Sequence, residues 1–186
     1  MLQALKVRWA KHLKKICPTI KSISLNCTDV YILIPRSQVI PFLSFMRDSS
    51  LVQANQLVDI VVVDRPHLKN RFLITYCLLS THYSTRYYVQ VLLQDLQPIE
   101  TSAFVFNSAN WLEREVWDMF GIYFTHHPDL RRILTDYGFD AHPLRKDFPV
   151  TGETALMYSD IFRDIRYQPV KLYQEYRVFT LNKTWT

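Results

Sequence analysis

Glycine is so scarce in this chain that several common folds are excluded from the start. The 186 residues include three glycines, Gly121, Gly138 and Gly152, which all lie beyond residue 120. Average usage of about 7% would give roughly 13. Nucleotide-binding loops such as GxGxxG and GxxxxGKS/T need closely spaced glycines, because a side chain would keep the backbone away from the phosphate groups. Neither loop can be written in this sequence, so the commonest nucleotide-binding folds are excluded.

Composition and length are those of a globular chain without a membrane-spanning segment. Hydrophobic residues make up 48% of the sequence, and 22 Lys and Arg exceed 17 Asp and Glu. The longest stretch free of these charged residues is residues 72–85, a run of 14. A spanning helix needs about 18 or more apolar residues, so none is predicted.

The three cysteines, Cys17, Cys27 and Cys77, are widely spaced. Because no CxxC pair occurs, the usual sequence ligands of an iron–sulfur cluster or a structural zinc are missing. An odd count also argues against a disulfide-stapled secreted domain and favours a reducing compartment. We expect all three to be small buried residues.

The start of the chain, residues 1–28, carries a strong positive charge. It contains no acid and six cations, Lys6, Arg8, Lys11, Lys14, Lys15 and Lys21. Apolar residues recur between them at helical spacing, at Leu2, Leu5, Trp9, Leu13 and Ile16. Such a basic amphipathic helix could bind anionic lipid or nucleic acid, or act as a transit peptide. We favour a surface helix packed on its own domain, because no aromatic-rich stripe accompanies the charges.

The pattern up to residue 106 predicts an α+β domain. Strands are expected over residues 20–25, 30–34, 57–63, 72–79 and 87–93. A helix is expected over residues 37–47, with Pro41 in its first turn and a buried stripe at Val39, Leu43 and Met46. A hairpin, a helix and a strand meander in this order predict a mainly antiparallel sheet with helices on one side.

A second helix is predicted over residues 111–120. Its expected apolar stripe consists of Leu112, Val116, Met119 and Phe120. Asn110 and Glu113 have the spacing of a capping box, in which each side chain binds a free backbone N–H at the start of the helix. Arg114 and Asp118 are four residues apart, so we expect them to form an ion pair. Gly121 suits the left-handed position that ends a helix.

Regular periodicity fades after Gly121, although aromatic side chains remain frequent. They include Tyr158, Phe162, Tyr167, Tyr173, Tyr176, Phe179 and Trp185. We therefore divide the chain into an α+β domain, residues 1–121, and an irregular interface loop followed by a long extended C-terminal arm, residues 122–186. An aromatic-rich arm left in water would promote aggregation, so we expect the arm to dock on another chain. The alternative, in which it folds back on its own sheet, stays open.

Residues 113–149 form the segment richest in charge, and a metal site is one interpretation of it. The candidate ligands are His126 or His127 with Asp129, Asp136 and His142. Adjacent histidines in extended chain point to opposite faces, so only one of the pair could bind, and no HExxH spacing occurs. A metal-dependent hydrolase using His127, Asp129 and His142 is kept as the alternative function. Other catalytic designs fit less well, because no GxSxG elbow occurs.

A protein interface uses the same residues better. Cations and acids alternate here, with Arg131, Arg132, Arg145 and Lys146 interleaved with Asp129, Asp136, Asp140 and Asp147. Arginine binds carboxylates in bidentate fashion, so such a set can hold an irregular loop in one shape. Pro128, Pro143 and Pro149 stiffen the loop further by fixing φ. Exposed ion pairs stabilise little, which favours an interface that removes them from water.

Three ordered segments carry a resemblance to a known family. They are Trp-Leu-Glu-Arg-Glu-Val-Trp-Asp-Met-Phe-Gly-Ile over residues 111–122, His-Pro-Asp-Leu-Arg-Arg-Ile-Leu-Thr-Asp-Tyr-Gly-Phe over 127–139, and His-Pro-Leu-Arg-Lys-Asp-Phe-Pro over 142–149. Together they closely resemble the thirty-kilodalton subunit of respiratory complex I, and the resemblance runs from about residue 30 to the end. One departure is Ala141, where the family usually has glycine before His-Pro. A glycine needed there at positive φ would make alanine cost about 1 kcal/mol.

The resemblance implies a cofactor-free core subunit of the matrix-side peripheral arm of mitochondrial, proton-pumping NADH:ubiquinone oxidoreductase. FMN and iron–sulfur clusters are then expected in partner subunits, and the isolated chain is expected to be non-catalytic. The implied partners are the forty-nine-kilodalton quinone-module subunit and neighbouring iron–sulfur subunits, with no nucleic acid. A basic nucleic-acid binder acting through residues 1–21 remains a third interpretation. The expected partner-interface residues are Glu113, Arg114, Glu115, Asp118, His127, Asp129, Arg131, Arg132, Asp136, His142, Arg145, Lys146, Asp147, Tyr176 and Arg177.

Overall fold

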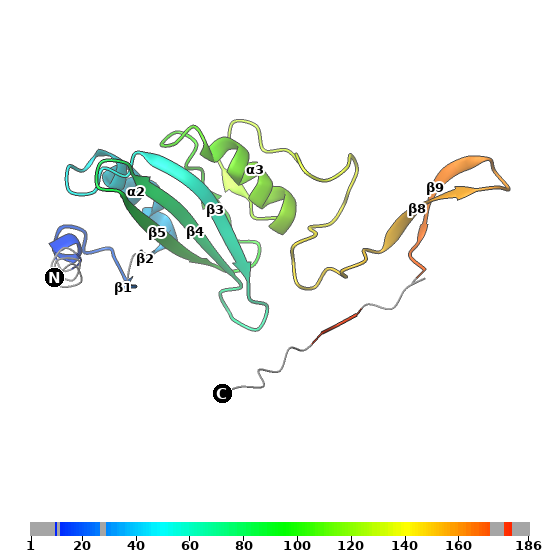
Figure 1. Ribbon diagram of the computed structural model, residues 1–186, viewed down its shortest axis with the longest axis horizontal. Coiled ribbons are helices and arrows are strands. Elements are labelled where there is room, and N and C mark those ends of the chain that lie inside the picture. The colour runs from blue at the N-terminus through cyan, green and yellow to red at the C-terminus, as the bar shows by residue number, and fades with distance from the viewer. Residues whose placement is uncertain (1–9, 11, 27–28, 172–176, 180–186) are drawn as a thin grey trace. The chain divides into compact units, whose positions relative to one another are not determined.

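The computed structural model describes residues 10, 12–26, 29–171 and 177–179, and the chain divides into two compact units (Figure 1). The larger unit ends at Phe148 and the smaller begins at Pro149. Sequence analysis divides the chain after Gly121, whereas residues 122–148 belong to the larger unit. This loop packs on the unit through the contacts described below.

The larger unit is built on a five-stranded sheet. Its strands are β1 (Ser22–Leu25), β2 (Val30–Ile34), β3 (Gln56–Asp64), β4 (Phe72–Ser80) and β5 (Thr85–Leu93), in the order β1-β2-β5-β4-β3. β2 and β5 run parallel, and every other neighbouring pair is antiparallel. The α+β class with a mainly antiparallel sheet is therefore confirmed. All five predicted strands are present.

One face of this sheet forms the core together with two helices. The 3₁₀ turn η1 (Arg36–Gln38) leads into α2 (Val39–Asp48), which buries Val39, Leu43 and Met46 as predicted. Pro41 is the third residue of α2, where its missing N–H has no acceptor within the helix. The inward residues of the sheet, such as Ile32, belong to the same buried cluster as those of α2 and of the second helix.

The second helix, α3 (Ala109–Phe120), lies between two short strands that pair with each other. β6 (Ile99–Glu100) precedes it and β7 (Phe124–Thr125) follows it, and the two are parallel. The predicted capping box is wrong. α3 begins two residues earlier than expected, at Ala109, and its N-cap residue Ser108 makes no side-chain cap hydrogen bond. Gly121 ends the helix in the left-handed conformation, φ 74°, as predicted.

The predicted basic helix at the start of the chain is described in part. Residues 12–16 are helical and Leu13 is buried in the core, as expected for a packed surface helix. Other residues of the predicted basic helix lie outside the described residues, namely Leu2, Leu5, Lys6, Arg8, Trp9 and Lys11. Within the described ranges, no helix is long and apolar enough to cross a membrane.

The smaller unit contains a β-hairpin that sequence analysis does not predict. Its strands are β8 (Thr154–Ser159) and β9 (Asp164–Pro169), which pair antiparallel. The expectation of an irregular, extended arm is therefore wrong for these two strands. Tyr173, Tyr176 and Trp185 lie outside the described residues.

The two described cysteines are half-buried rather than buried. Cys17 and Cys77 are free thiols, and Cys27 lies outside the described residues. Burial in β4 raises the pKa of Cys77 to about 11, because the thiolate is poorly solvated there. This thiol is therefore protonated and unreactive at neutral pH.

Candidate functional site

The charged segment singled out by sequence analysis wraps around α3, and Asp118 organises it. The Asp118 carboxylate is fully buried and accepts backbone N–H bonds from Ile133, Leu134 and Thr135 at 3.2, 2.8 and 2.9 Å. The hydroxyl of Thr135 donates at 2.6 Å and the guanidinium of Arg132 at 3.0 Å. Burial raises the pKa of Asp118, but these hydrogen bonds outweigh it and lower that pKa to about 2.

Asp118 pairs with Arg132 in the loop and not with Arg114, so the predicted i,i+4 ion pair is wrong for these two described residues. Arg114 instead donates from Nε to the carbonyl of Arg131 at 3.4 Å. Its guanidinium lies over the ring of Trp111, 5.1 Å from the centroid. The buried carboxylate needs several donors at once, and the loop supplies them from one short stretch.

A second contact closes the C-terminal end of α3. Three consecutive helix carbonyls accept hydrogen bonds from the loop, Asp118 from His142 Nδ1 at 3.0 Å, Met119 from the N–H of Leu144 at 3.1 Å and Phe120 from Arg145 Nε at 2.6 Å. The last carbonyls of a helix find no donor within it, so outside donors must satisfy them. The loop therefore serves as the C-terminal cap of α3.

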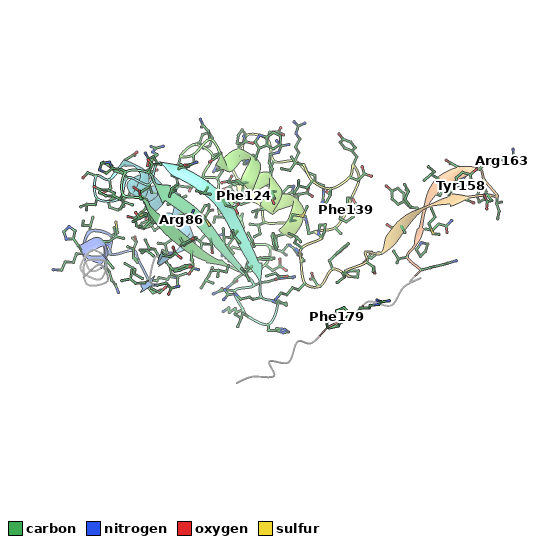
Figure 2. All side chains as sticks on the ribbon, viewed as in Figure 1. Arg86, Phe124, Phe139, Tyr158, Arg163 and Phe179 are labelled. Carbon is green, nitrogen blue, oxygen red and sulfur yellow. The ribbon has the colours of Figure 1, made fainter. Side chains whose placement is uncertain are left out.

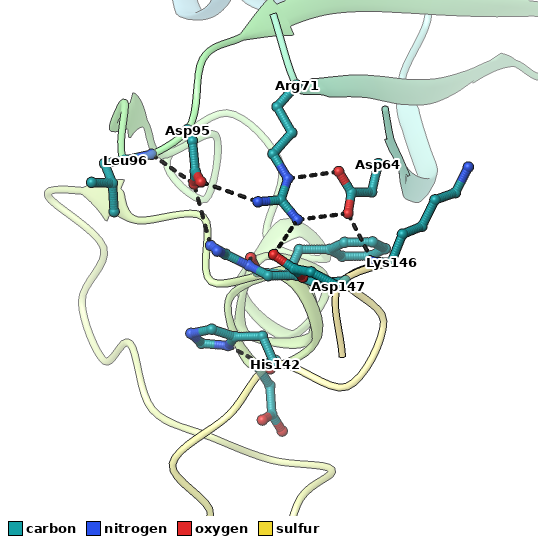
Figure 3. Close-up of polar contacts among 10 residues, drawn as sticks. Asp64, Arg71, Asp95, Leu96, His142, Lys146 and Asp147 are labelled. Atoms are coloured by element: carbon teal, nitrogen blue, oxygen red, sulfur yellow. Dashed lines mark hydrogen bonds and ion pairs between the residues drawn. The ribbon is translucent and has the colours of Figure 1, made fainter. Parts of the chain in front are cut away.

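A clasp of charged side chains ties the same loop to the sheet (Figure 3). Arg71 binds Asp64 in bidentate fashion at 2.8 and 2.9 Å and also reaches Asp95 at 3.2 Å and Asp147 at 3.0 Å. Asp64 accepts in addition the N–H of Lys146 at 2.9 Å. The hydrogen bond from Arg71 lowers the pKa of Asp64, which is buried. These contacts join the β3–β4 turn to the loop.

Glu113 is a second buried acid of α3. Its carboxylate accepts the hydroxyl of Thr101 at 2.5 Å and both the N–H and the hydroxyl of Ser102 at 2.6 Å. Burial raises the pKa of Glu113, and these hydrogen bonds offset part of that increase. Glu113 therefore fixes residues 101–102 to α3, a role that replaces the predicted capping.

His127 is held beside Glu113 by contacts that define its tautomer. Nδ1 accepts the N–H of Asp129 at 3.2 Å, and Nε2 lies 3.2 Å from the carbonyl of Asn110 and 3.8 Å from the Glu113 carboxylate. A carbonyl accepts only, so the proton is assigned to Nε2. Both ring nitrogens are thus engaged within the chain.

The proposed metal ligands are not brought together. His127 contacts the carbonyl of Asn110 and His142 that of Asp118. Eight helix positions separate these carbonyls, about 12 Å at 1.5 Å per residue. In the part of the chain that the structure describes, no group of three or more His, Cys, Asp or Glu side chains could hold a metal ion. The geometry therefore gives the hydrolase alternative no support.

Seven of the candidate interface residues are exposed, although the side chain of Asp147 and the backbone N–H of Lys146 also belong to the clasp around Arg71. The seven are Glu115, Asp129, Arg131, Asp136, Lys146, Asp147 and Arg177. Arg131 and Asp129 form an ion pair at 3.0 Å while their side chains stay 70% and 55% exposed. Tyr176 lies outside the described residues. Ala141 is not among the described side-chain-bearing residues with positive φ, so the expected strain is not found, and its carbonyl accepts Arg132 Nη1 at 2.8 Å.

Comparison with protein families identifies this architecture. The model of the 30 kDa subunit of respiratory-chain NADH dehydrogenase matches residues 32–154. The chain belongs to this family. The match covers most of the sheet, α3 and the whole loop that caps it.

Curated relatives within this family extend the match to nearly the full chain. Subunit 9 of NADH-ubiquinone oxidoreductase from Dictyostelium citrinum is 40% identical over 185 residues, 97% of this chain and 88% of that protein. The Acanthamoeba castellanii subunit 9 is 44% identical over 84% of this chain and 80% of that protein. The C subunit of NADH-quinone oxidoreductase from Rhodospirillum rubrum is 42% identical over 84% of this chain and 74% of its own length.

Two solved structures share the fold of this family. A trypsin-resistant fragment of Nqo5 matches with a TM-score of 0.55 and 29% identity, over 66% of this chain and 99% of the fragment. A chain of an archaeal membrane-bound sulfane sulfur reductase matches with a TM-score of 0.68 over 77% of this chain and 85% of its own. At 23% identity, the second likeness shows the fold alone.

Asp64, Arg71 and Asp95 belong to this arrangement although the sequence does not predict a role for them. One local signal existed at Asp64, a lone acid at the end of an apolar strand, on the face that alternation assigns to the core. A buried carboxylate at such a position requires a cation or several hydrogen-bond donors as partners. Asp95 follows β5 in a turn and gives no comparable signal.

Proposed function

We propose that this chain is a scaffold subunit of the peripheral arm of NADH:ubiquinone oxidoreductase, on the matrix side of the mitochondrial inner membrane. The family match over residues 32–154 carries the proposal. Relatives from Dictyostelium and Acanthamoeba that are named NADH-ubiquinone oxidoreductase subunit 9 support the mitochondrial setting. The enzyme as a whole transfers electrons from NADH to ubiquinone, and FMN and iron–sulfur clusters in partner subunits supply that chemistry.

The geometry supports a scaffold rather than a catalyst. The buried acids Glu113 and Asp118 are saturated by donors of the chain itself. His127 and His142 are likewise bound to carbonyls of α3. A general base needs a free position facing a substrate, and these groups are used to fix the loop. The hydrogen bonds of these four side chains hold the loop on α3 and so give the surface of the loop a defined shape.

The surface so defined is the proposed contact with the forty-nine-kilodalton quinone-module subunit and neighbouring iron–sulfur subunits. Asp129 and Arg131 are exposed on the loop, and Glu115 is exposed on α3. An exposed ion pair contributes little to the stability of its own chain, but it can exchange partners at an interface. The arm, residues 149–186, extends this contact over the partner subunits in our proposal.

Affinity purification from solubilised mitochondrial membranes tests this function. The tagged chain should bring down the other peripheral-arm subunits in stoichiometric amounts, together with NADH:ubiquinone reductase activity. The purified chain by itself should show no flavin or iron–sulfur absorbance. Recovery of the chain alone, without other subunits, would contradict the proposal.

A further inference from the structure

The parallel pair β6–β7 brings two polar segments to the same side of α3. Thr101 and Ser102 follow β6, and His127 follows β7, whose buried Phe124 is labelled in Figure 2. Because the two strands are parallel, both segments leave the pair at the same end. Both then reach the buried carboxylate of Glu113, which binds Thr101 and Ser102 and lies 3.8 Å from Nε2 of His127.

The hydrogen-bond donors around Glu113 are neutral. Its buried carboxylate accepts two hydroxyls and one backbone N–H. Burial and the charge of Glu113 raise the pKa of the Tyr76 phenol well above its ordinary value, so Tyr76 stays neutral as well. Within the described residues, His127 is the only side chain in ion-pair contact with Glu113. A positive charge on His127 would therefore give this carboxylate the counter-charge that buried ions need.

The other ring nitrogen of His127 opposes a second proton. Nδ1 accepts the backbone N–H of Asp129 at 3.2 Å, and the single proton of the neutral ring, on Nε2, faces the carbonyl of Asn110. A proton on Nδ1 would place two donors against each other. The neutral ring therefore holds the turn over residues 127–129 closed, and a doubly protonated ring is incompatible with this closed turn.

The carboxylate of Asp129 offers a proton on Nδ1 an acceptor close by. In the closed turn it binds Arg131 at 3.0 Å, in a pair whose side chains are 55% and 70% exposed. Such an exposed pair contributes little stability, whereas a hydrogen bond between an imidazolium and a carboxylate is stronger than one between neutral groups. An exchange of Arg131 for His127 as the partner of Asp129 therefore requires little free energy.

The backbone before the turn is under strain. His126 has φ +61°, a left-handed conformation that is uncommon for a residue with a side chain. Such a conformation persists only where the surrounding contacts hold it in place. The hydrogen bond between His127 and the N–H of Asp129 is one of these contacts, so its loss would release the strain.

The charges around His127 come from α3 and from the loop. α3 supplies Glu113 and Arg114, and the loop supplies Asp129 and Arg131. The two acids favour a positive ring and the two arginines oppose it. Glu113 and the backbone of Asp129 contact the ring itself, whereas Arg114 binds the carbonyl of Arg131 and Arg131 binds the carboxylate of Asp129. The contacts therefore favour the acids.

We infer that residues 126–131 form a pH-operated switch on the surface of the loop. A second proton on His127, taken from water as the pH falls, releases the N–H of Asp129 and moves the Asp129 carboxylate from Arg131 to the imidazolium. Arg131 then faces solvent without its carboxylate. The meaning of the switch for assembly rests on the proposed function, whereas the switch itself belongs to the single chain.

Nuclear magnetic resonance of the purified chain tests the switch. Spectra that correlate the ring protons and nitrogens of His127 are recorded from about pH 8 to about pH 5.5, the range in which histidine changes charge. As the pH falls, the ring should pass from the Nε2-protonated form to the doubly protonated form, and the amide signal of Asp129 should shift in parallel. A ring that stays neutral, or an Asp129 amide that does not follow the ring, would overturn the inference.

Glu113 is the competing site for the proton, because burial raises its pKa. The side-chain carboxyl carbon of Glu113 reports a proton there in the same titration. Its signal should stay that of a carboxylate while His127 gains its second proton. If Glu113 is protonated before His127, the N–H of Asp129 keeps its acceptor and the switch does not exist.

His127→Gln separates the ring from other titrating groups. The amide oxygen of glutamine can accept the N–H of Asp129, but it cannot take a proton in this range. The pH response of the Asp129 amide should therefore disappear in this variant. A response that persists would show that another group causes it, which overturns the inference.

Two acid variants with matched controls test the charges. Glu113→Gln should lower the fraction of doubly protonated His127 at about pH 6 by about tenfold, because the imidazolium loses its buried counter-charge. Asp129→Asn should lower it about threefold, because this carboxylate is exposed. Glu115→Gln on α3 and Asp136→Asn in the loop remove the same charge elsewhere and should change it less than about 1.5-fold.

The variant of Asp129 decides the test even if the buried Glu113→Gln does not fold. Equal effects of Asp129→Asn and Asp136→Asn would overturn the exchange of partners. A wild-type chain that purifies without other subunits contradicts the proposed function and leaves the switch, which is measured on the chain alone, as it is. A chain that assembles normally, with an Asp129 amide that ignores the protonation of His127, overturns only the switch.

Discussion

A Cβ atom added to Gly121 would lie 2.5 Å from Nε2 of His142, closer than real Cβ contacts allow. Gly121 also has φ +74°, a conformation that costs a non-glycine residue about 1 kcal/mol. Gly121→Ala should therefore lower the free energy of unfolding by about 2–4 kcal/mol, because strain and displacement of the helix cap add. Denaturant unfolding of the purified chain measures the change.

Gly138→Ala is the matched control for this prediction. Gly138 has nearly the same conformation, φ +75°, but no atom lies within 4 Å of the added Cβ. Its substitution should cost only the backbone term of about 1 kcal/mol. If both variants lose the same stability, the close packing of His142 against Gly121 contributes nothing to the free energy of unfolding.

Asp118 predicts a specific dependence of stability on pH. Its pKa is lowered to about 2 in the folded chain, against an ordinary value of 3.8. Because the folded chain favours the ionised carboxylate, Asp118 stabilises the fold at pH values above 3.8, the pKa of the unfolded chain. This stabilisation is lost as the pH falls from 3.8 towards 2. The contribution is about 2 kcal/mol, at 1.36 kcal/mol per pKa unit.

Asp118→Asn removes this contribution. The variant should be less stable than the wild type by about 2–4 kcal/mol at pH 7. The NH2 group of the asparagine would face hydrogen-bond donors, which the carboxylate of Asp118 accepts and an NH2 group cannot accept. The difference should narrow as the pH is lowered from 4 to 2. Urea unfolding at a series of pH values measures it, and a difference that stays constant over this range would contradict the assignment.

The strands of the five-stranded sheet and the helices α2 and α3 follow from local patterns, whereas the polar contacts around α3 do not. The alternation at Tyr87, Val89 and Val91 predicts a strand, because every second residue of a strand points to the same face of the sheet and here these residues are apolar. Glu113 has a local capping signal, yet its carboxylate binds Thr101 and Ser102. Thr101 and Ser102 lie more than ten residues before Glu113 in the sequence, so the contact forms only when that segment packs on the helix. A pattern of a few neighbouring residues therefore predicts the wrong partner for Glu113.

The hairpin β8–β9 has a local pattern in the sequence, but that pattern is too weak to predict it. Leu156 and Tyr158 alternate with other residues, and Ile165 and Tyr167 do the same across a turn. The signal was present, but each run is only six residues long and neither face is consistently buried. Periodicity predicts a strand most strongly when one face is buried, a condition that the isolated hairpin does not meet.

The clasp around Arg71 predicts that a lysine cannot replace this arginine. Arg71 uses its planar fork to bind Asp64 while also contacting Asp95 and Asp147. Arg71→Lys should cost about 1–3 kcal/mol, since a single ammonium cannot reproduce the bidentate contact. In the wild type, Asp64 holds the backbone N–H of Lys146 and is itself held by Arg71. Trypsin should therefore cut the Arg71→Lys variant faster after Lys146.

Arg131→Lys controls for the substitution itself. Arg131 pairs with Asp129 in the open, with 70% of its side chain exposed. Such a pair contributes about 0.5 kcal/mol or less, so the variant should unfold like the wild type. Equal losses for Arg71→Lys and Arg131→Lys would show that the clasp adds no stability of its own.

Neighbouring arginines in the loop predict opposite phenotypes on charge reversal. Arg132 binds the buried Asp118, so Arg132→Glu should place two carboxylates together and destabilise the isolated chain by more than about 3 kcal/mol. Arg131 points to solvent and pairs only with exposed Asp129 among the described ion pairs, so Arg131→Glu should leave the unfolding free energy within about 0.5 kcal/mol of the wild type. In mitochondria, however, Arg131→Glu should reduce the amount of assembled oxidoreductase, because the exposed charge is the one available to a partner. Normal assembly of the Arg131 variant would exclude this side of the loop from the interface, whatever Arg132→Glu does to folding.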